Sequence, residues 1–162
     1  MGHASDFENE IRIETVTGIF RENANRIREP DYTAMSSKTS TQPIQVKVRS
    51  QYIPQRSKPN SEVYFFAYTI TITNTGEAAA KLISRHWYIT DAYDQAEEIQ
   101  GDGVVGEQPH LLPGESFEYT SFCPLKTQYG TMRGFYHFIY DDGASFEVPI
   151  PEFPLLIPAL AN

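Results

Sequence analysis

The fold of this chain is decided by residues 62–74, which read Glu-Val-Tyr-Phe-Phe-Ala-Tyr-Thr-Ile-Thr-Ile-Thr-Asn. Every second residue from Tyr64 to Ile72 is aromatic or aliphatic, and the intervening positions include Thr69, Thr71 and Thr73. Successive side chains of a β-strand point to opposite faces, so one face of this stretch is apolar and the other suits solvent. The stretch therefore predicts a strand with one face against a core.

The same period of two recurs on both sides of this strand. The further alternating positions are Ile44, Val46 and Val48, then Trp87 and Ile89, Phe117 and Tyr119, Met132 to Tyr140, and Phe146 to Ile150. Turn signals separate them at Asn74–Glu77, at Leu112–Glu115 with Pro-Gly in its centre, and at Asp142-Gly143. Residues 43–162 therefore predict an all-β domain, an antiparallel β-sandwich of the immunoglobulin or fibronectin type III kind.

Residues 1–42 have a different character. Ser5 and Glu8 have the spacing of a capping box, whereas Gly18 and neighbouring β-branched residues oppose a helix. An approximate helical stripe is formed by Phe7, Ile11, Ile19, Phe20 and Ile27. We expect an extension that is partly helical or disordered, with a hydroxyl-rich linker over 33–42. Met35 raises the alternative that residues 1–34 were added ahead of a natural start, and composition leaves both origins open.

The composition indicates one globular domain and argues against nucleic acids and membranes as its partners. The chain has 162 residues, of which 40% are hydrophobic and 21% charged, so its core needs no disulfide or metal. The formal net charge is −8. Because binding to nucleic acid depends on neutralising phosphates, and membrane surfaces are anionic, this charge disfavours both kinds of partner.

The termini and the cysteine usage indicate a cytoplasmic protein. Cys123 is the single cysteine, so no disulfide within the chain can form. The first 14 residues lack the basic and apolar regions of a secretory signal. The longest apolar run, 153–161, is too short to span a bilayer and contains two prolines.

A glycine string, Gly101-Asp102-Gly103-Val104-Val105-Gly106, has the spacing G-x-G-x-x-G. In dinucleotide-binding folds such glycines open a helix toward a pyrophosphate, but here the next turn follows too soon for a helix. Two interpretations remain. The favoured one is a turn between strands that uses positive φ angles. The other is an anion-binding loop whose carboxylates are offset by Arg85, Arg133 or Lys126.

No set of residues forms a recognisable catalytic or metal-binding motif. The histidines His3, His86, His110 and His137 lack the spacings of zinc sites, and Cys123 has no cysteine partner. A weak Mg²⁺ site is conceivable at Asp91, Asp94, Glu97 and Glu98, although a solvated acidic turn is favoured. Ser121 lies outside a nucleophile motif, and Cys123 reads as a packed residue. We therefore predict a protein that is not an enzyme and has no resident cofactor.

Several motifs together strongly resemble the ApaG family, also called CorD. They are Ser84-Arg85-His86-Trp87, the string 101–109, Leu112 to Ser121, Gly130 to Tyr136, and Ile150-Pro151-Glu152-Phe153. The resemblance covers about residues 43–160. Residues 122–124, Phe-Cys-Pro, depart from the small residues common in the family.

The resemblance implies a fibronectin-like sandwich in a bacterial cytoplasmic protein, associated with cobalt resistance and magnesium efflux. It implies a candidate pyrophosphate site at Gly101, Gly103 and Gly106, with Arg85, His86 and Trp87 as neighbouring signature residues. A weak Mg²⁺ or Co²⁺ association accompanies these expectations. No catalytic residues are established for the family, so none are assigned.

Two functions follow as hypotheses. The chain has ten Tyr, ten Phe and one Trp, more than one small core needs, although cross-strand pairing accounts for many of them. The first hypothesis is therefore a module that binds a protein partner through an edge strand or an aromatic face. The second is a module that binds a nucleotide polyphosphate, such as ATP or diadenosine tetraphosphate, at 101–106 without hydrolysing it.

Overall fold

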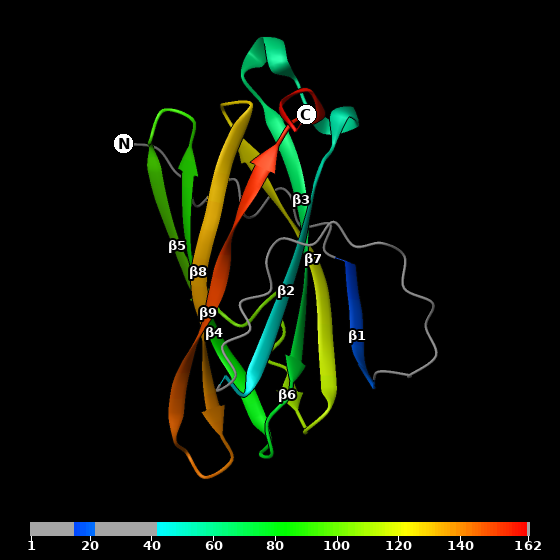
Figure 1. Ribbon diagram of the computed structural model, residues 1–162, viewed down its shortest axis with the longest axis vertical. Helices are drawn as coiled ribbons and strands as arrows, with labels where there is room; N and C mark the ends of the chain where they lie inside the picture. The colour runs from blue at the N-terminus through cyan, green and yellow to red at the C-terminus, as the bar shows by residue number, and fades with distance from the viewer. Residues whose placement is uncertain (1–14, 22–41, 162) are drawn as a thin grey trace.

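The structure, a computed structural model, describes residues 15–21 and 42–161. The described chain is almost entirely antiparallel β-structure, arranged as two sheets packed face to face (Figure 1). The predicted all-β sandwich is confirmed. No helix in the described ranges is long and apolar enough to cross a membrane.

One sheet has four strands in the order β1-β7-β3-β2. Their bounds are β1 Thr15–Arg21, β7 Glu115–Leu125, β3 Tyr64–Asn74 and β2 Ile44–Tyr52. The alternating stretch 62–74 contains β3, which lies in the interior of this sheet and pairs with a strand on each side.

The second sheet has the order β5-β4-β8-β9, and the short β6 also pairs with β4. Its strands are β5 Ala96–Asp102, β4 Ala80–Asp91, β8 Tyr129–Tyr140, β9 Ser145–Leu156 and β6 His110–Leu111. Three single-turn 3₁₀ helices complete the described chain: η1 Pro54–Arg56, η2 Pro59–Ser61 and η3 Pro158–Leu160.

The period of two assigns the faces of β3 correctly. Phe66, Ile70 and Ile72 are fully buried between the sheets. The threonines on the opposite face form hydrogen bonds across to β7, at 2.8 Å for Thr69 with Thr120, 2.9 Å for Thr71 with Glu118 and 2.7 Å for Thr73 with Ser116. The solvent face of the sheet is therefore held by a ladder of hydroxyl contacts as well as by its backbone.

Aromatic rings fill the centre of the sandwich. Tyr68, Trp87 and Phe153 pack with ring centroids 5.5 to 5.9 Å apart. Beside them the hydroxyls of Tyr119 and Tyr136 share a buried hydrogen bond of 2.6 Å. Burial, followed by the neighbouring tyrosines, raises the pKa of Tyr119 well above its usual value, and burial also raises the pKa of Tyr136.

The predicted turns are present. Glu115 N–H donates to the Leu112 carbonyl at 2.9 Å, which closes the Pro-Gly turn. Asn74, fully buried, fixes the turn at the end of β3, because its side chain donates to the carbonyls of Ala78 and Leu111 at 2.9 Å. Tyr140 N–H donates to the Ala144 carbonyl at 2.8 Å in the β8–β9 hairpin.

The N-terminal extension gives one correction. Residues Thr15–Arg21 form the strand β1, so the helical stripe predicted through Ile19 and Phe20 is wrong there. The β-branched residues near Gly18 that weakened the helix prediction favour the strand. The remaining predictions for this extension, including the capping box at Ser5, the stripe at Phe7, Ile11 and Ile27, and the linker up to residue 41, lie outside the described residues.

Candidate functional site

The glycine string 101–106 forms the end of a strand and a tight turn. Gly101 and Asp102 are the last residues of β5. Val104 and Glu107 then exchange two backbone hydrogen bonds of 2.8 Å around Val105 and Gly106, whose φ angles are +47° and +78°. Two positive φ angles in a two-residue loop define a type I′ turn. No helix follows, as the sequence predicts.

The backbone of this turn is used largely within the protein. Gly103, with φ +61°, has the carbonyl oxygen of Glu107 where a Cβ would lie, and its N–H donates to the Ile83 carbonyl at 2.7 Å. Val104 is fully buried and anchors the turn in the core. Among the described residues, only the N–H groups of Val105 and Gly106 in this turn have no acceptor, which leaves a small part of the loop for an anion.

Arg85 lies against the string from the neighbouring strand β4. Its Nη1 donates to the carbonyls of Asp102 at 3.0 Å and Gly103 at 3.1 Å. A Cβ on Gly101 would come within 2.8 Å of the same nitrogen. Glycine at position 101 therefore makes room for the guanidinium, which clamps the end of β5 through two carbonyl oxygens.

The other cations named for this loop have different surroundings. Arg133 lies on β8, with its guanidinium carbon 4.4 Å from the ring centroid of Tyr88. Lys126 belongs to the β7–β8 connection, which Thr127 ties to Ala92 through a 3.1 Å hydrogen bond. That connection lies beyond the Asp91 end of β4, away from the glycine string at the other end of this strand.

The signature residues Arg85, His86 and Trp87 divide between three environments. Arg85 holds the glycine turn, whereas Trp87 is only 2% exposed and packs in the aromatic core. His86 lies on the outer face of the second sheet, with Nε2 2.5 Å from Glu98 Oε1. Its ring stacks on Tyr88 at a centroid distance of 4.7 Å and packs at a tilt against Phe135 at 4.8 Å. Among the contacts of these three residues, the one with the string is made by Arg85, whose guanidinium donates to the carbonyls of Asp102 and Gly103.

A shallow depression of about 410 Å³ lies on this outer face beside Gly101. It is lined by Ser84, Arg85, His86, Gln100, Gly101, Asp102, Phe135 and His137. The register also aligns Ser84, His137 and Glu147 across β4, β8 and β9. No hydrogen bond within the part described joins these three side chains, as a Ser-His-acid triad would require.

The residues considered for metal binding are not gathered. Asp91 Oδ1 instead accepts the N–H groups of Tyr93 at 2.8 Å and Gln95 at 3.0 Å, which makes it a turn-forming residue. No group of three or more His, Cys, Asp or Glu in residues 15–21 and 42–161 could hold a metal ion. Cys123 is buried, and burial followed by the charge of Glu97 raises the pKa of its thiol to about 12.

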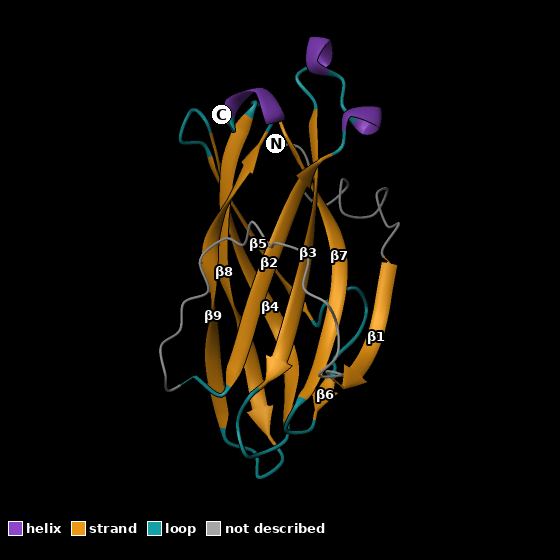
Figure 2. Cartoon of the chain, turned by 45° about the vertical axis from the view of Figure 1, so that its right-hand side comes forward, coloured by secondary structure: helices purple, strands orange, loops and turns teal. Residues whose placement is uncertain are grey.

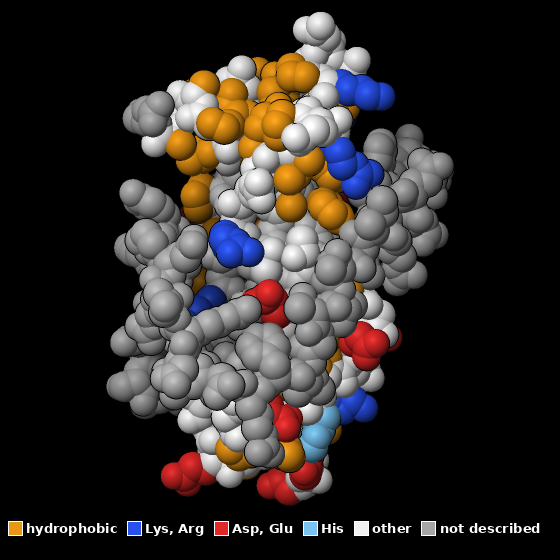
Figure 3. Space-filling model, turned by 90° about the vertical axis from the view of Figure 1, so that its right-hand side faces the viewer, with side chains coloured by type: hydrophobic (Ala, Val, Ile, Leu, Met, Phe, Trp, Pro, Cys, Tyr) orange, Lys and Arg blue, Asp and Glu red, His pale blue; other side chains and the backbone are white. Residues whose placement is uncertain are grey.

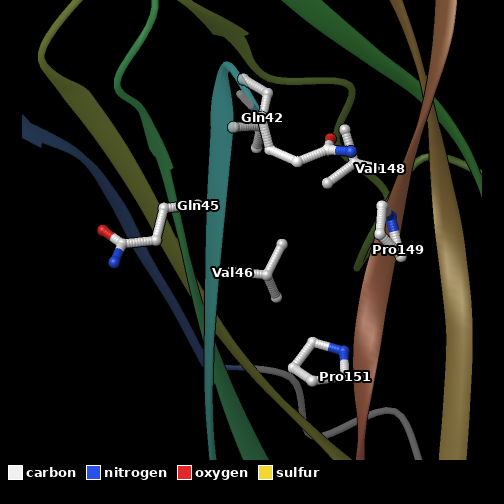
Figure 4. Close-up of a pocket in the computed structure, with 7 residues that line it drawn as sticks. Gln42, Gln45, Val46, Val148, Pro149 and Pro151 are labelled. Carbon is white, nitrogen blue, oxygen red and sulfur yellow. The ribbon is translucent and has the colours of Figure 1, made fainter. Parts of the chain in front are cut away.

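A second small cavity lies between the edge strands of the two sheets. Figure 4 shows Val46 of β2 facing Val148, Pro149 and Pro151 of β9, with Gln42 at one end. Its volume of about 20 Å³ is enough for roughly one water molecule. It therefore has no room for an organic ligand.

Comparisons with known proteins decide the family. The family model described as the ApaG domain matches residues 54–140. This chain belongs to the ApaG family. The match includes all of β3, β4, β5, β6, β7 and β8, together with the glycine turn. The resemblance read from the sequence motifs is confirmed.

Relatives and solved structures extend the match beyond the family model. Proteins named Protein ApaG from Anaeromyxobacter dehalogenans and Ralstonia nicotianae are 53% and 55% identical, over 75% and 74% of this chain and 96% of each relative. The crystal structure of a Bordetella pertussis protein described as ApaA is 55% identical with a TM-score of 0.70, covering 71% of this chain and 94% of that one. An X-ray structure of a structural genomics target is 47% identical with a TM-score of 0.69, and the match covers 73% of this chain and 89% of that one.

The edges of the ApaG sandwich differ in how they are covered. The edge strand β9 contains Pro149, Pro151 and Pro154, which lack N–H donors, and Ser50 of β2 donates to the Pro154 carbonyl at 2.9 Å. The edge strand β5 has the exposed carboxylates Glu97 and Glu98. Sequence reasoning did not single out these edges, although the three prolines were a readable signal.

The edge of β7 carries another strand. β1 pairs antiparallel with β7, from Thr15 opposite Thr120 to Arg21 opposite Glu115, and Figures 1 and 2 both show the two strands side by side. β1 lies outside residues 54–140, which the ApaG domain model matches. Without β1, β7 would be the edge strand of its sheet. Only the β-branched residues near Gly18 pointed to a strand at this place in the sequence.

Proposed function

We propose that this ApaG-family chain is a non-enzymatic protein-interaction module that receives an extended segment of its partner on the edge of β7. Strand addition of this kind draws affinity from backbone hydrogen bonds and specificity from alternate side chains. The partner is a cytoplasmic protein in this proposal, as the family resemblance and the single cysteine suggest.

The observation that carries the proposal is the pairing of β1 with β7. A segment outside the family match, joined to the domain by a long connection, adds to this edge in antiparallel register. The edge therefore has geometry that accepts an added strand. Residues Glu115 to Cys123 contain no proline, so every N–H of this part of β7 is available for pairing on one side or the other.

The surroundings of β7 supply side-chain contacts for a partner. Phe117 and Tyr119, which are 3% and 2% exposed, point inward at the positions that β1 pairs. On the outer face, the Arg56 guanidinium lies 4.5 Å from the ring centroid of Phe65 and 5.5 Å from that of Phe122. Figure 3 shows hydrophobic side chains with Lys or Arg beside them at the upper end of the face turned to the viewer.

A peptide-display selection on the full chain tests this proposal. The bait carries Ile19→Pro/Phe20→Pro. Adjacent residues of a strand direct their N–H groups to opposite sides, so one of the two prolines removes a hydrogen bond to β7. We expect the pair of prolines to detach β1 from β7. We expect enriched peptides that compete with a synthetic peptide of residues 12–24. Failure to enrich any peptide, or enrichment of peptides that residues 12–24 do not displace, would contradict strand addition at β7.

Polyphosphate binding at Gly101–Gly106 is the second candidate. The depression beside Gly101 supports it, because His86, His137 and Arg85 line this depression and the N–H groups of Val105 and Gly106 lie nearby in sequence. In this candidate the family's link with cobalt and magnesium arises through cations that accompany the phosphates.

Amide chemical shifts test the second candidate. ATP, diadenosine tetraphosphate, pyrophosphate and Mg²⁺ or Co²⁺ alone would each be titrated into the isotope-labelled chain. Saturable shifts confined to the turn and the depression, reduced by Gly101→Ala through displacement of Arg85, would support the site. Shifts elsewhere, or none at millimolar ligand, would exclude it.

A further inference from the structure

We infer that Thr15–Arg21 is an intramolecular ligand of the β7 edge, so that this chain blocks the site on which its partner docks. The inference rests on the proposed function of that edge. It adds a regulatory element: the partner's segment must displace β1 before it can pair with β7.

The register of β1 makes it an imperfect occupant. Val16 lies opposite Tyr119 and Ile19 lies opposite Phe117. Between these two pairs the chain moves along by three residues in β1 but by only two in β7. The shift falls at Thr17-Gly18 and divides the strand into two short blocks. A partner segment that alternates without this interruption would form a continuous ladder along the same positions. It would therefore exchange for β1 with a net gain in pairing.

The order of the strands permits pairing within one chain. Arg21, the last residue of β1, lies opposite Glu115 of β7. Ser116, next along β7, lies opposite Thr73 of β3, and Ile44 at the start of β2 lies opposite Asn74. The end of β1 and the start of β2 are thus at the same end of the sheet, three strand spacings of about 4.8 Å apart.

The connecting chain is long enough for this distance. Residues 22–43 separate Arg21 from Ile44, and an extended chain reaches about 3.3 Å per residue, several times the roughly 14 Å across the sheet. A tethered segment of this kind has an effective concentration on the order of millimolar. Suppose that β1 as a free peptide binds the β7 edge with a dissociation constant of about 0.1 mM. Tethering then leaves the β7 edge free of β1 in roughly one molecule in ten, and it lowers the apparent affinity of an added peptide about tenfold.

The register of β1 with β7 also indicates which pattern of apolar residues a segment needs in order to displace β1. Because Phe117 and Tyr119 face the core, a partner gains most from apolar residues at the register positions opposite them. In this chain those positions hold Ile19 and Val16. The partner is thus an extended segment with apolar residues separated by a single residue, since an unbroken strand keeps the period of two.

Fluorescence anisotropy of a labelled peptide of residues 12–24 tests the inference on three full-length chains. These are the unmodified chain, the Ile19→Pro/Phe20→Pro variant, and an Ala24→Pro/Asn25→Pro control that carries the same two prolines after β1. We expect the variant with prolines in β1 to bind the peptide at least about tenfold more tightly than the other two. Circular dichroism and unfolding of each chain check that the sandwich is intact.

A cross-linked chain provides a second route that does not depend on the prolines. Thr15 and Thr120 are register partners, so Thr15→Cys/Thr120→Cys should form a disulfide that locks β1 in place. Oxidation should abolish peptide binding, and reduction should restore the affinity of the unmodified chain. An oxidised chain that still binds the peptide would overturn the inference.

The outcomes separate this inference from the proposed function. Equal peptide affinity in all three chains would overturn self-blocking and leave strand addition standing. Absence of binding to the chain with prolines in β1 would overturn both. An unmodified chain that sediments as a dimer, and becomes a monomer with those prolines, would show that β1 pairs with a second copy and would overturn pairing within the chain.

Discussion

Gly134, on β8, illustrates how single residues set the spacing of the second sheet. A Cβ on this residue would overlap the carbonyl oxygen of His86 on β4. The two backbones therefore approach more closely than any side chain allows, and the register of β8 with β9 shifts at the same place. The glycine lies in Gly130–Tyr136, one of the motifs that carry the family resemblance, and this close approach gives it a structural role.

We predict that Gly134→Ala lowers the free energy of unfolding by about 1–3 kcal/mol, because a rigid backbone atom occupies the space of the new methyl group. Gly101→Ala is the matched control, since its new Cβ meets the flexible end of Arg85. Urea unfolding of both variants measures the difference. A Gly134→Ala protein as stable as the unmodified one would contradict the close approach.

The Tyr119–Tyr136 hydroxyl pair gives a second prediction at this scale. Tyr119→Phe leaves the Tyr136 hydroxyl buried with no partner, which should cost about 1–3 kcal/mol, and the reverse substitution should behave likewise. The double phenylalanine variant should lose less than the sum of the two. A double-mutant cycle by denaturant unfolding measures this coupling, and strict additivity would show that the hydroxyls do not support each other.

At the scale of elements, the sequence predicted strands well and the N-terminal extension poorly. Each long strand of the sandwich has one face that meets the core, so burial enforces the period of two. β1 lacks that strong signal, because its seven residues contain Gly18 and a register shift, and its strand conformation depends on the neighbouring β7. Pairing with a distant strand is a tertiary effect that local propensity does not encode.

The glycine turn shows a further limit of sequence reasoning. The spacing G-x-G-x-x-G suggested a ligand, and the structure uses the glycines for a type I′ turn and for room beside Arg85. The sequence could favour the backbone role, since no helix could follow. It could not reveal that Val105 takes a positive φ, because that angle normally calls for Asn, Asp or Gly.

We predict that Val105→Asn raises the free energy of unfolding by about 1 kcal/mol, because asparagine tolerates the left-handed backbone that strains valine. Val104→Asn is a control with the same chemical change at the preceding residue. It should destabilise the protein, since Val104 is fully buried. Thermal unfolding measures both signs, and a destabilising Val105→Asn would mean that the packing of Val105 outweighs its strain.

At the scale of the whole molecule, the buried thiol of Cys123 and the buried hydroxyls of Tyr119 and Tyr136 make the fold less stable at high pH. Burial raises the pKa of Cys123 from 9.0 to about 12, and those of Tyr119 and Tyr136 above 10.0. Well below pH 9 these three groups are protonated in both states, so they add no pH dependence to the free energy of unfolding. Above it the unfolded chain loses protons that the folded chain keeps, so each group lowers the free energy of unfolding by up to about 1.4 kcal/mol per pH unit.

We therefore predict that stability is lost in two stages as pH rises, the first above the usual thiol pKa and the second above the usual tyrosine pKa. Urea unfolding across this range measures the loss, and Cys123→Ala should remove the first stage only. Constant stability through both pKa values would show that these groups are accessible to solvent.

In the whole molecule the edge strands β2 and β9 of the two sheets lie against each other. At the other side of the sandwich, β5 ends one sheet, and β1 covers the edge of β7 in the other. The formal net charge is −8, and no group of three or more His, Cys, Asp or Glu in the described residues could hold a metal ion. The edge of β7 differs from the others because a segment of the chain already pairs with it.

The most direct measurement is amide chemical-shift mapping on the isotope-labelled full chain carrying Ile19→Pro/Phe20→Pro, titrated with the unlabelled peptide of residues 12–24. Occupation of the β7 edge predicts saturable shifts centred on Glu115–Thr120. Shifts centred on the outer face of β4 and β5, or an unchanged spectrum at about 1 mM peptide, would contradict it.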